Sequence, residues 1–319
     1  MPSDIKPTKA QRQTDARARA AEMRRKQEAT AKRNRVIAIS FAVVVVLALV
    51  GAVTYVLVNN RHSADAYSSA AFGGADSDSA NLVPPDLAGA KAPSTANTSG
   101  GIPVSAAGVG KTGANDTVLQ VYFDMQCPVC AQFDSVNSAD LQALAKEPGI
   151  TILYQPLSFL DHASQGTRYS NRAANALMTV ADKDPTHFEA FITALFQQQP
   201  AENTKGLTDD KIASIATGVG VPESVSATFT DTVSGSYQLK DATSGAVTDK
   251  TGSWRNFSEF VAAATEHASS QPVFAKNGLG TPSLVLDGTQ IGAGGSDNVN
   301  WTTPGSLKAY VEAAAAKKG

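Results

Sequence analysis

Residues 117–130 read TVLQVYFDMQCPVC, and this stretch decides the fold. Its first part, Thr117 to Phe123, is mostly β-branched or aromatic and predicts a strand. Apolar residues then recur at helical spacing from Pro128 to Lys146, and Pro148-Gly149 stops the predicted helix. A second run of strand length, ITILY, occupies residues 150–154. A strand, a helix and a strand in so short a span predict a βαβ unit with two parallel strands.

The two cysteines of the chain, Cys127 and Cys130, lie where the predicted helix begins. Unpaired backbone N–H groups and the positive end of the helix dipole stabilise a thiolate there. Pro128 suits the first helical position, where no N–H is required. The i, i+3 spacing puts both sulfurs on one face, within reach of a disulfide. We expect Cys127 to be exposed and nucleophilic, and Cys130, deeper in the helix, to be the resolving thiol.

Two other uses of the cysteine pair compete with this redox hypothesis. A mononuclear zinc site would need two further ligands, and the sequence offers no second Cys-x-x-Cys and no ligand spacing among His162, His187 and His267. We therefore predict no metal site. The other alternative, a local bridge that is purely structural, stays open at this point.

The segment from Phe123 to Cys130, FDMQCPVC, resembles the active-site strand and turn of thioredoxin-fold disulfide oxidoreductases, specifically the exported DsbA-like branch. The likeness is strengthened by Gly280-Thr281-Pro282, which precedes a predicted strand at residues 283–286. It covers about residues 117–319. It implies an α/β thioredoxin fold with a helical insertion, at about residues 161–279, and no cofactor.

This resemblance also implies roles for individual residues. The bond between Thr281 and Pro282 is cis in the family and stands beside the cysteine pair, where it docks a substrate strand; an ordinary trans turn proline is the alternative. Asp124 is either a buried proton acceptor for Cys130 or a solvated carboxylate at a strand end. Val129 stands where strong oxidases of the family often have histidine, so we expect a milder oxidant.

Helical patterns occupy the sequence between the cysteine motif and the Gly280-Thr281-Pro282 motif. They occur at residues 166–181, 185–199, 208–217 and 256–267, and an Ala-rich helix is expected at residues 301–318. Residues 241–255 are polar and contain glycine, so we expect a surface loop there.

The region before the predicted domain divides into three parts. Residues 1–35 hold 11 Lys and Arg against 4 Asp and Glu and predict a basic cytoplasmic tail. Residues 36–58 carry no charge and are long enough to cross a bilayer, which predicts a transmembrane signal anchor with the remainder of the chain exported. Residues 59–116 are rich in Ala, Ser and Gly and predict a flexible linker.

Two alternatives compete with the transmembrane anchor. Ala64-Asp65-Ala66 resembles a signal-peptide cleavage site, but the apolar run is longer than such peptides usually carry. A buried helix of a soluble protein is improbable for an apolar run this long and this rich in valine.

These patterns together predict a membrane-tethered oxidase that introduces disulfides into exported, cysteine-containing proteins through Cys127 and Cys130. The family implies a quinone-linked membrane partner for re-oxidation, and the anchor implies contact with the lipid bilayer. The acidic balance after residue 35 argues against a nucleic-acid groove. The competing functions are a reductase or isomerase, and a non-catalytic envelope scaffold with an inert bridge.

Overall fold

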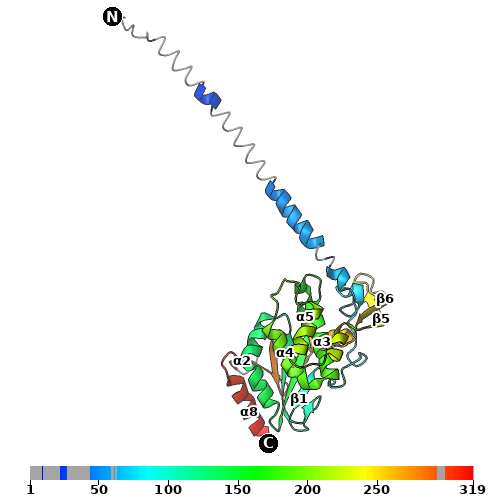
Figure 1. Ribbon diagram of the computed structural model, residues 1–319, viewed down its shortest axis with the longest axis vertical. Helices are drawn as coiled ribbons and strands as arrows, with labels where there is room; N and C mark the ends of the chain where they lie inside the picture. The colour runs from blue at the N-terminus through cyan, green and yellow to red at the C-terminus, as the bar shows by residue number, and fades with distance from the viewer. Residues whose placement is uncertain are drawn as a thin grey trace. The chain divides into compact units, whose positions relative to one another are not determined.

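The computed structural model describes residues 9, 22–26, 44–58, 61, 63–292 and 299–318 (Figure 1), and the chain divides into two units, Met1–Asn59 and Asn60–Gly319. In the described part of the chain, one helix, Val44–Ala66, is long and apolar enough to cross a membrane. All side chains at residues 44–58 are exposed. Residues 36–43 of the expected anchor, and most of the basic tail, lie outside the described residues.

The second unit is built on a six-stranded mixed sheet. The strands are β1 (Ile102–Ser105), β2 (Gly108–Val109), β3 (Thr117–Asp124), β4 (Ile150–Leu157), β7 (Ser283–Leu286) and β8 (Thr289–Ile291), in the order β2-β1-β4-β3-β7-β8. β3 and β4 are parallel, in register from Thr117 opposite Ile150 to Asp124 opposite Leu157. The predicted βαβ unit is therefore confirmed.

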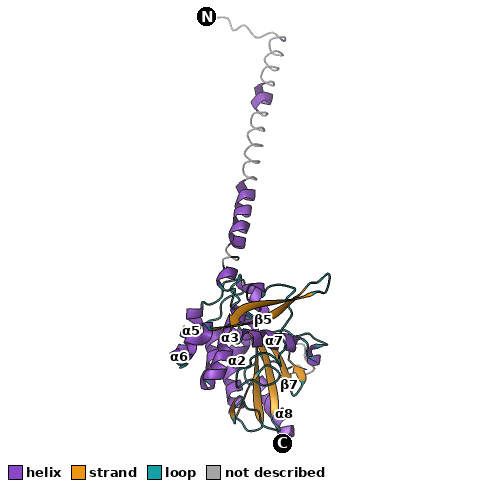
Figure 2. Cartoon of the chain, turned by 90° about the vertical axis from the view of Figure 1, so that its right-hand side faces the viewer, coloured by secondary structure: helices purple, strands orange, loops and turns teal. Residues whose placement is uncertain are grey.

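Seven α-helices follow β3 in the described residues of the second unit. They are α2 (Pro128–Leu144), α3 (Tyr169–Lys183), α4 (Phe188–Gln197), α5 (Asp209–Gly218), α6 (Glu223–Ser226), α7 (Ser258–Ser269) and α8 (Ser306–Lys318). The expected insertion between β4 and β7 is thus mainly helical, as Figure 2 shows. α2 packs against α4 on one side and α8 on another. The carboxy-terminal helix begins at Ser306, later than expected.

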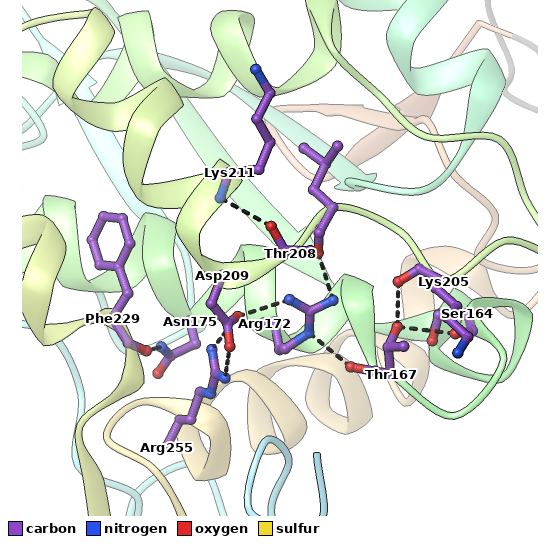
Figure 3. A network of polar contacts seen from close by, with 11 residues as sticks. Ser164, Thr167, Arg172, Asn175, Lys205, Thr208, Asp209, Lys211, Phe229 and Arg255 are labelled. Atoms are coloured by element: carbon purple, nitrogen blue, oxygen red, sulfur yellow. Dashed lines mark hydrogen bonds and ion pairs between the residues drawn. The ribbon is translucent and has the colours of Figure 1, made fainter. Parts of the chain in front are cut away.

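A buried ion network ties three parts of the insertion together (Figure 3). Asp209, at the start of α5, accepts from Arg172 of α3 at 2.8 Å and from Arg255 at 2.6 Å. The Arg172 side chain is fully buried. Its remaining N–H groups donate to the carbonyl oxygens of Thr167 and Leu207. Because a buried guanidinium is stable only when its donors are paired, this network fixes α3 and α5 relative to the strand that carries Arg255.

The expectation of a surface loop at residues 241–255 is wrong. Residues 247–255 form β6 (Val247–Arg255), which pairs antiparallel with β5 (Thr232–Lys240), and only the turn between them is irregular. Tyr237 and Trp254 lie buried on one side of this hairpin, where their rings meet Phe72. The sequence did not predict these strands because it is mostly polar, and only the inward side chains of a surface hairpin need to be apolar.

The expected flexible linker is also corrected, because residues 63–116 lie on the domain. We call these residues the amino-terminal segment. Its strand β1 pairs with β4, Phe72 is 5% exposed beside Trp254, and Tyr67 lies over the Arg172 guanidinium at 4.4 Å. The segment has too few apolar residues for a core of its own. It is ordered because the insertion and the edge of the sheet supply apolar surface and hydrogen-bond partners.

Candidate active site

The two cysteines lie at the turn that joins β3 to α2. Cys127 is the N-cap of α2 in an extended conformation, with φ −78° and ψ 116°, and Pro128 occupies the first turn. The turn is closed by the Cys127 N–H, which donates to the Asp124 carbonyl at 3.0 Å. The Cys130 N–H donates in turn to the Cys127 carbonyl, also at 3.0 Å. Strand β3 therefore delivers Cys127 to a helix start, as the sequence predicts.

Both thiols are free and both are buried, which corrects the expectation that Cys127 is exposed. Cys127 is 6% exposed and Cys130 is fully buried, whereas Val129 between them is 46% exposed. The neighbouring loop covers the first sulfur, since Cys127 Sγ lies 3.2 Å from the Thr281 carbonyl oxygen and can donate to it. Only a small part of Cys127 is therefore accessible from solvent.

The two thiols have opposite acidities. The pKa of Cys127 is lowered from 9.0 to about 6, chiefly by a hydrogen bond from the Cys130 thiol; burial opposes this shift, and Thr281 and the N–H groups of Cys130 and Val129 add to it. The pKa of Cys130 is raised far above its ordinary value, first by burial and then by the neighbouring Cys127. At neutral pH the pair thus has one thiolate, which sits on the more accessible sulfur.

The loop before β7 brings the second predicted motif to the cysteines. The peptide bond between Thr281 and Pro282 is cis, as expected. The Thr281 carbonyl faces the Cys127 sulfur across a sequence separation of 154 residues. β7 pairs antiparallel with β3, which ends at the active-site turn, and this pairing places the loop beside the cysteines. Six predicted site residues therefore gather here: Cys127, Pro128, Val129, Cys130, Thr281 and Pro282.

Asp124 lies behind this group and is completely buried, so the solvated alternative is excluded. Its carboxylate accepts from the Gln126 N–H at 2.8 Å, the Leu160 N–H at 2.9 Å and the Ser170 hydroxyl at 2.6 Å. Burial raises the pKa of Asp124, and these three donors oppose the shift. The carboxyl is therefore poised to take up a proton more readily than an ordinary aspartate.

Sequence reasoning missed the residues that hold the active-site turn from the insertion. Gln199 Nε2 donates to the carbonyl oxygens of Met125 and Cys127, and Gln126 Nε2 donates to the Ala163 carbonyl. Ser170, on α3, bonds the Asp124 carboxylate. Gln199 and Ser170 are distant in the chain from the motif, and no local pattern distinguishes them or Gln126 from surface amides and hydroxyls.

The described residues contain no group of three or more His, Cys, Asp or Glu side chains that could hold a metal ion. A buried thiol paired with an acidic thiol at a helix start, beside a cis-proline loop, supports thiol–disulfide exchange. Fold and site define the class: a thioredoxin-fold thiol–disulfide oxidoreductase with the helical insertion of DsbA-like proteins.

Comparison with known proteins agrees with that class. A family model described as thioredoxin matches residues 105–303, and the chain belongs to this family. No curated protein sequence matches the chain. Among solved structures, MdbA, a thiol-disulfide oxidoreductase from Actinomyces oris, is similar in fold, with a TM-score of 0.51, 21% identity, and 72% of this chain and 95% of that one covered.

Two further structures are more distant. DsbA from Mycobacterium tuberculosis in its reduced form gives a TM-score of 0.45 at 20% identity, with 69% of this chain and 99% of that one covered. BdbD from Bacillus subtilis in its oxidised form gives a TM-score of 0.47 at 15% identity, with 73% of this chain and all of that one covered.

Proposed function

We propose that this protein is an extracytoplasmic oxidase that introduces disulfides into exported, cysteine-containing proteins. The observation that carries the proposal is the contrast within the cysteine pair, in which the pKa of Cys127 is lowered to about 6 while that of Cys130 is raised. A stabilised Cys127 thiolate favours the reduced enzyme, and an enzyme that prefers to be reduced gives its disulfide to others.

The proposed reaction begins with the enzyme holding a disulfide between Cys127 and Cys130. A substrate thiolate attacks Cys127 Sγ, the intramolecular bond breaks, and Cys130 leaves as a thiolate that takes up a proton. The second substrate thiolate then attacks the substrate sulfur of the mixed disulfide, and Cys127 leaves as a stable thiolate. Two electrons pass from the substrate to the enzyme, and the substrate gains one disulfide.

Asp124 is proposed as the group that exchanges the Cys130 proton. Its carboxyl is buried and its pKa is raised above that of an ordinary aspartate, which suits it to take up and release a proton during the reaction. The Cys130 thiol lies close to the Asp124 backbone, which contributes to its pKa. Proton transfer from the carboxyl to Cys130 accompanies the opening of the enzyme disulfide and reverses when the enzyme is re-oxidised.

The oxidase direction is favoured over its rivals by the acidity of Cys127. A less stable Cys127 thiolate would favour a reductase. An inert scaffold bridge does not need a stabilised thiolate at all. Val129 supplies no charge to Cys127, so the proposed enzyme is a milder oxidant than the strongest members, whose nucleophile has a pKa of about 3.5.

The proposed location rests on the apolar helix near the amino terminus and the basic residues before it. By the positive-inside rule the amino terminus stays in the cytoplasm and the domain that carries Cys127 is exported. The helix keeps the enzyme at the lipid bilayer, where a quinone-linked membrane partner would re-oxidise it.

The test is a stoichiometric transfer experiment with the full chain in detergent. The oxidised protein is mixed with a reduced, unfolded protein that has two cysteines, and both thiol counts are followed by alkylation. We expect the substrate to lose two thiols as the enzyme gains two, and the Cys130→Ala variant to transfer nothing. A disulfide that persists in the enzyme while the substrate stays reduced would establish the inert scaffold instead.

A further inference from the structure

The end of α4 lies against the active-site turn, although the two are distant in sequence. Phe196, in the last turn of α4, packs edge-to-face on Phe123 of β3 with 5.7 Å between ring centroids. About one turn earlier in the helix, the Thr193 hydroxyl donates to the Asp134 carboxylate of α2 at 3.3 Å. These two contacts position α4 relative to the strand and the helix that flank Cys127.

Gln199 extends this contact to the turn itself. Pro200 prevents α4 from continuing, and the Gln199 N–H still bonds the Phe196 carbonyl at 3.1 Å, so the backbone of Gln199 is held. Its Nε2 lies 3.0 Å from the Met125 carbonyl oxygen and 2.9 Å from the Cys127 carbonyl oxygen. A primary amide nitrogen has two hydrogens, one for each of these acceptors.

We propose that Gln199 is a positioning residue through which the helical insertion holds the active-site turn in the conformation that activates Cys127. The inference rests on the proposed redox function and deepens it. The Met125 and Cys127 carbonyls stand on either side of Gln126, whose own amide is tied to the Ala163 carbonyl at 3.0 Å. The insertion therefore holds the backbone carbonyls of Met125 and Cys127 and the side chain of Gln126 through these three hydrogen bonds.

The orientation of this turn determines how Cys127 is stabilised. Besides the Cys130 thiol, the N–H groups of Cys130 and Val129 lower the pKa of Cys127, and their direction depends on the backbone at the N-cap. When the Gln199 amide is lost, the two carbonyls lose a shared donor and the N-cap is free to rotate. The N–H groups then point less directly at the sulfur, and the thiolate is less stable.

The experiment compares Gln199→Met, which keeps the length of the side chain but has no donor, with Gln198→Met as the control. Gln198 is exposed and precedes the positioning residue directly. The full chain is reduced in detergent, and the ultraviolet absorbance of the thiolate is titrated, with the melting temperature measured in parallel. Only Cys127 titrates in the accessible range, because the pKa of Cys130 is raised far beyond it.

We expect Gln199→Met to raise the pKa of Cys127 by about half a unit or more, a roughly threefold loss of thiolate relative to thiol, with the control unchanged. If the Met variant does not fold, Gln199→Ala, which also lacks the donor and adds no charge, is titrated under the same criterion.

An unchanged pKa in Gln199→Met, with or without a lower melting temperature, would overturn the positioning role and leave Gln199 a packing residue. That failure differs from failure of the proposed function. The latter would appear in the parent chain, as a Cys127 that titrates like free cysteine.

Discussion

The Cys130 thiol is the first cause of the acidity of Cys127, because its hydrogen bond stabilises the neighbouring thiolate. We predict that Cys130→Ala raises the pKa of Cys127 by about one unit, whereas Cys130→Ser, whose hydroxyl still donates, raises it less. The measurement is the rate of alkylation of Cys127 against pH in each variant. Equal pKa values in the two variants would mean that the helix start alone sets the acidity.

Asp124 provides the second prediction at this scale. If its buried carboxyl exchanges the Cys130 proton, Asp124→Asn should slow opening of the enzyme disulfide by about tenfold or more near neutral pH. The matched control is Asp134→Asn, since burial also raises the pKa of Asp134, to about 6, on the same helix as Cys130. Rapid-mixing kinetics with a small thiol measure the step, and equal rates in all three proteins would leave Asp124 a purely structural residue.

At the scale of elements, the amino-terminal segment is part of the fold because its side chains complete an aromatic cluster. Phe72 contacts Trp254 at 4.8 Å and Tyr237 at 6.3 Å between ring centroids. We predict that Phe72→Ala lowers the free energy of unfolding by about 3 kcal/mol, as expected for a buried phenylalanine. Urea denaturation measures it, with the exposed Val247→Ala as the control; a loss no larger than that of the control would restore the flexible linker.

The ion network of Figure 3 makes a separate prediction about the insertion. Asp209→Asn leaves the guanidinium groups of Arg172 and Arg255 without a negative partner, and we expect a loss of about 3 kcal/mol of stability. Although burial alone would raise it, the pKa of Asp209 is lowered by the two arginines. Its stabilisation is therefore present above the ordinary aspartate pKa and is lost as the pH falls through the lower folded value.

Denaturation curves of Asp209→Asn and the exposed control Asp231→Asn, at neutral and acidic pH, check this prediction. The difference between the two variants should shrink in acid, because protonation removes the same charge from the parent chain. A constant difference would contradict the charge-based explanation.

For the whole molecule, the low pKa of Cys127 links the redox state to stability. A thiol whose pKa falls from 9.0 to about 6 stabilises the folded, reduced protein above the unfolded pKa, and the contribution is lost as the pH falls through about 6. At pH 7 the contribution is about 1.4 kcal/mol, which corresponds to roughly 30 mV of oxidising potential for two electrons.

We therefore predict that the melting temperature of the reduced protein rises relative to that of the oxidised protein between about pH 5 and pH 8. Calorimetry of both forms of the full chain in detergent measures this difference. The Cys127→Ser variant has no thiolate at this position. Comparing its melting temperature with that of the reduced parent chain at each pH isolates the contribution of the Cys127 thiolate. A difference between the two redox forms that is independent of pH would show that Cys127 is not ionised in the folded protein.

The approach of Thr281 and Pro282 to the cysteines was implied by the resemblance to a family. The sequence by itself determined the βαβ unit, the cysteine pair at the helix start and the helical character of the insertion. These follow from local periodicity and from a motif whose residues are close together in the chain. The hairpin β5–β6 was missed because its few inward side chains, such as Tyr237 and Trp254, are diluted by polar residues.

Only the tertiary structure decided that residues 63–116 pack on the domain, that Cys127 is covered, and that Asp124 and Gln199 brace the active-site turn. Each of these depends on a surface supplied by distant residues: β4 for strand β1, the Thr281 loop for the Cys127 sulfur, and α4 for the turn. Burial and hydrogen bonding each require two surfaces in contact. The composition of a segment describes only the surface that the segment itself contributes.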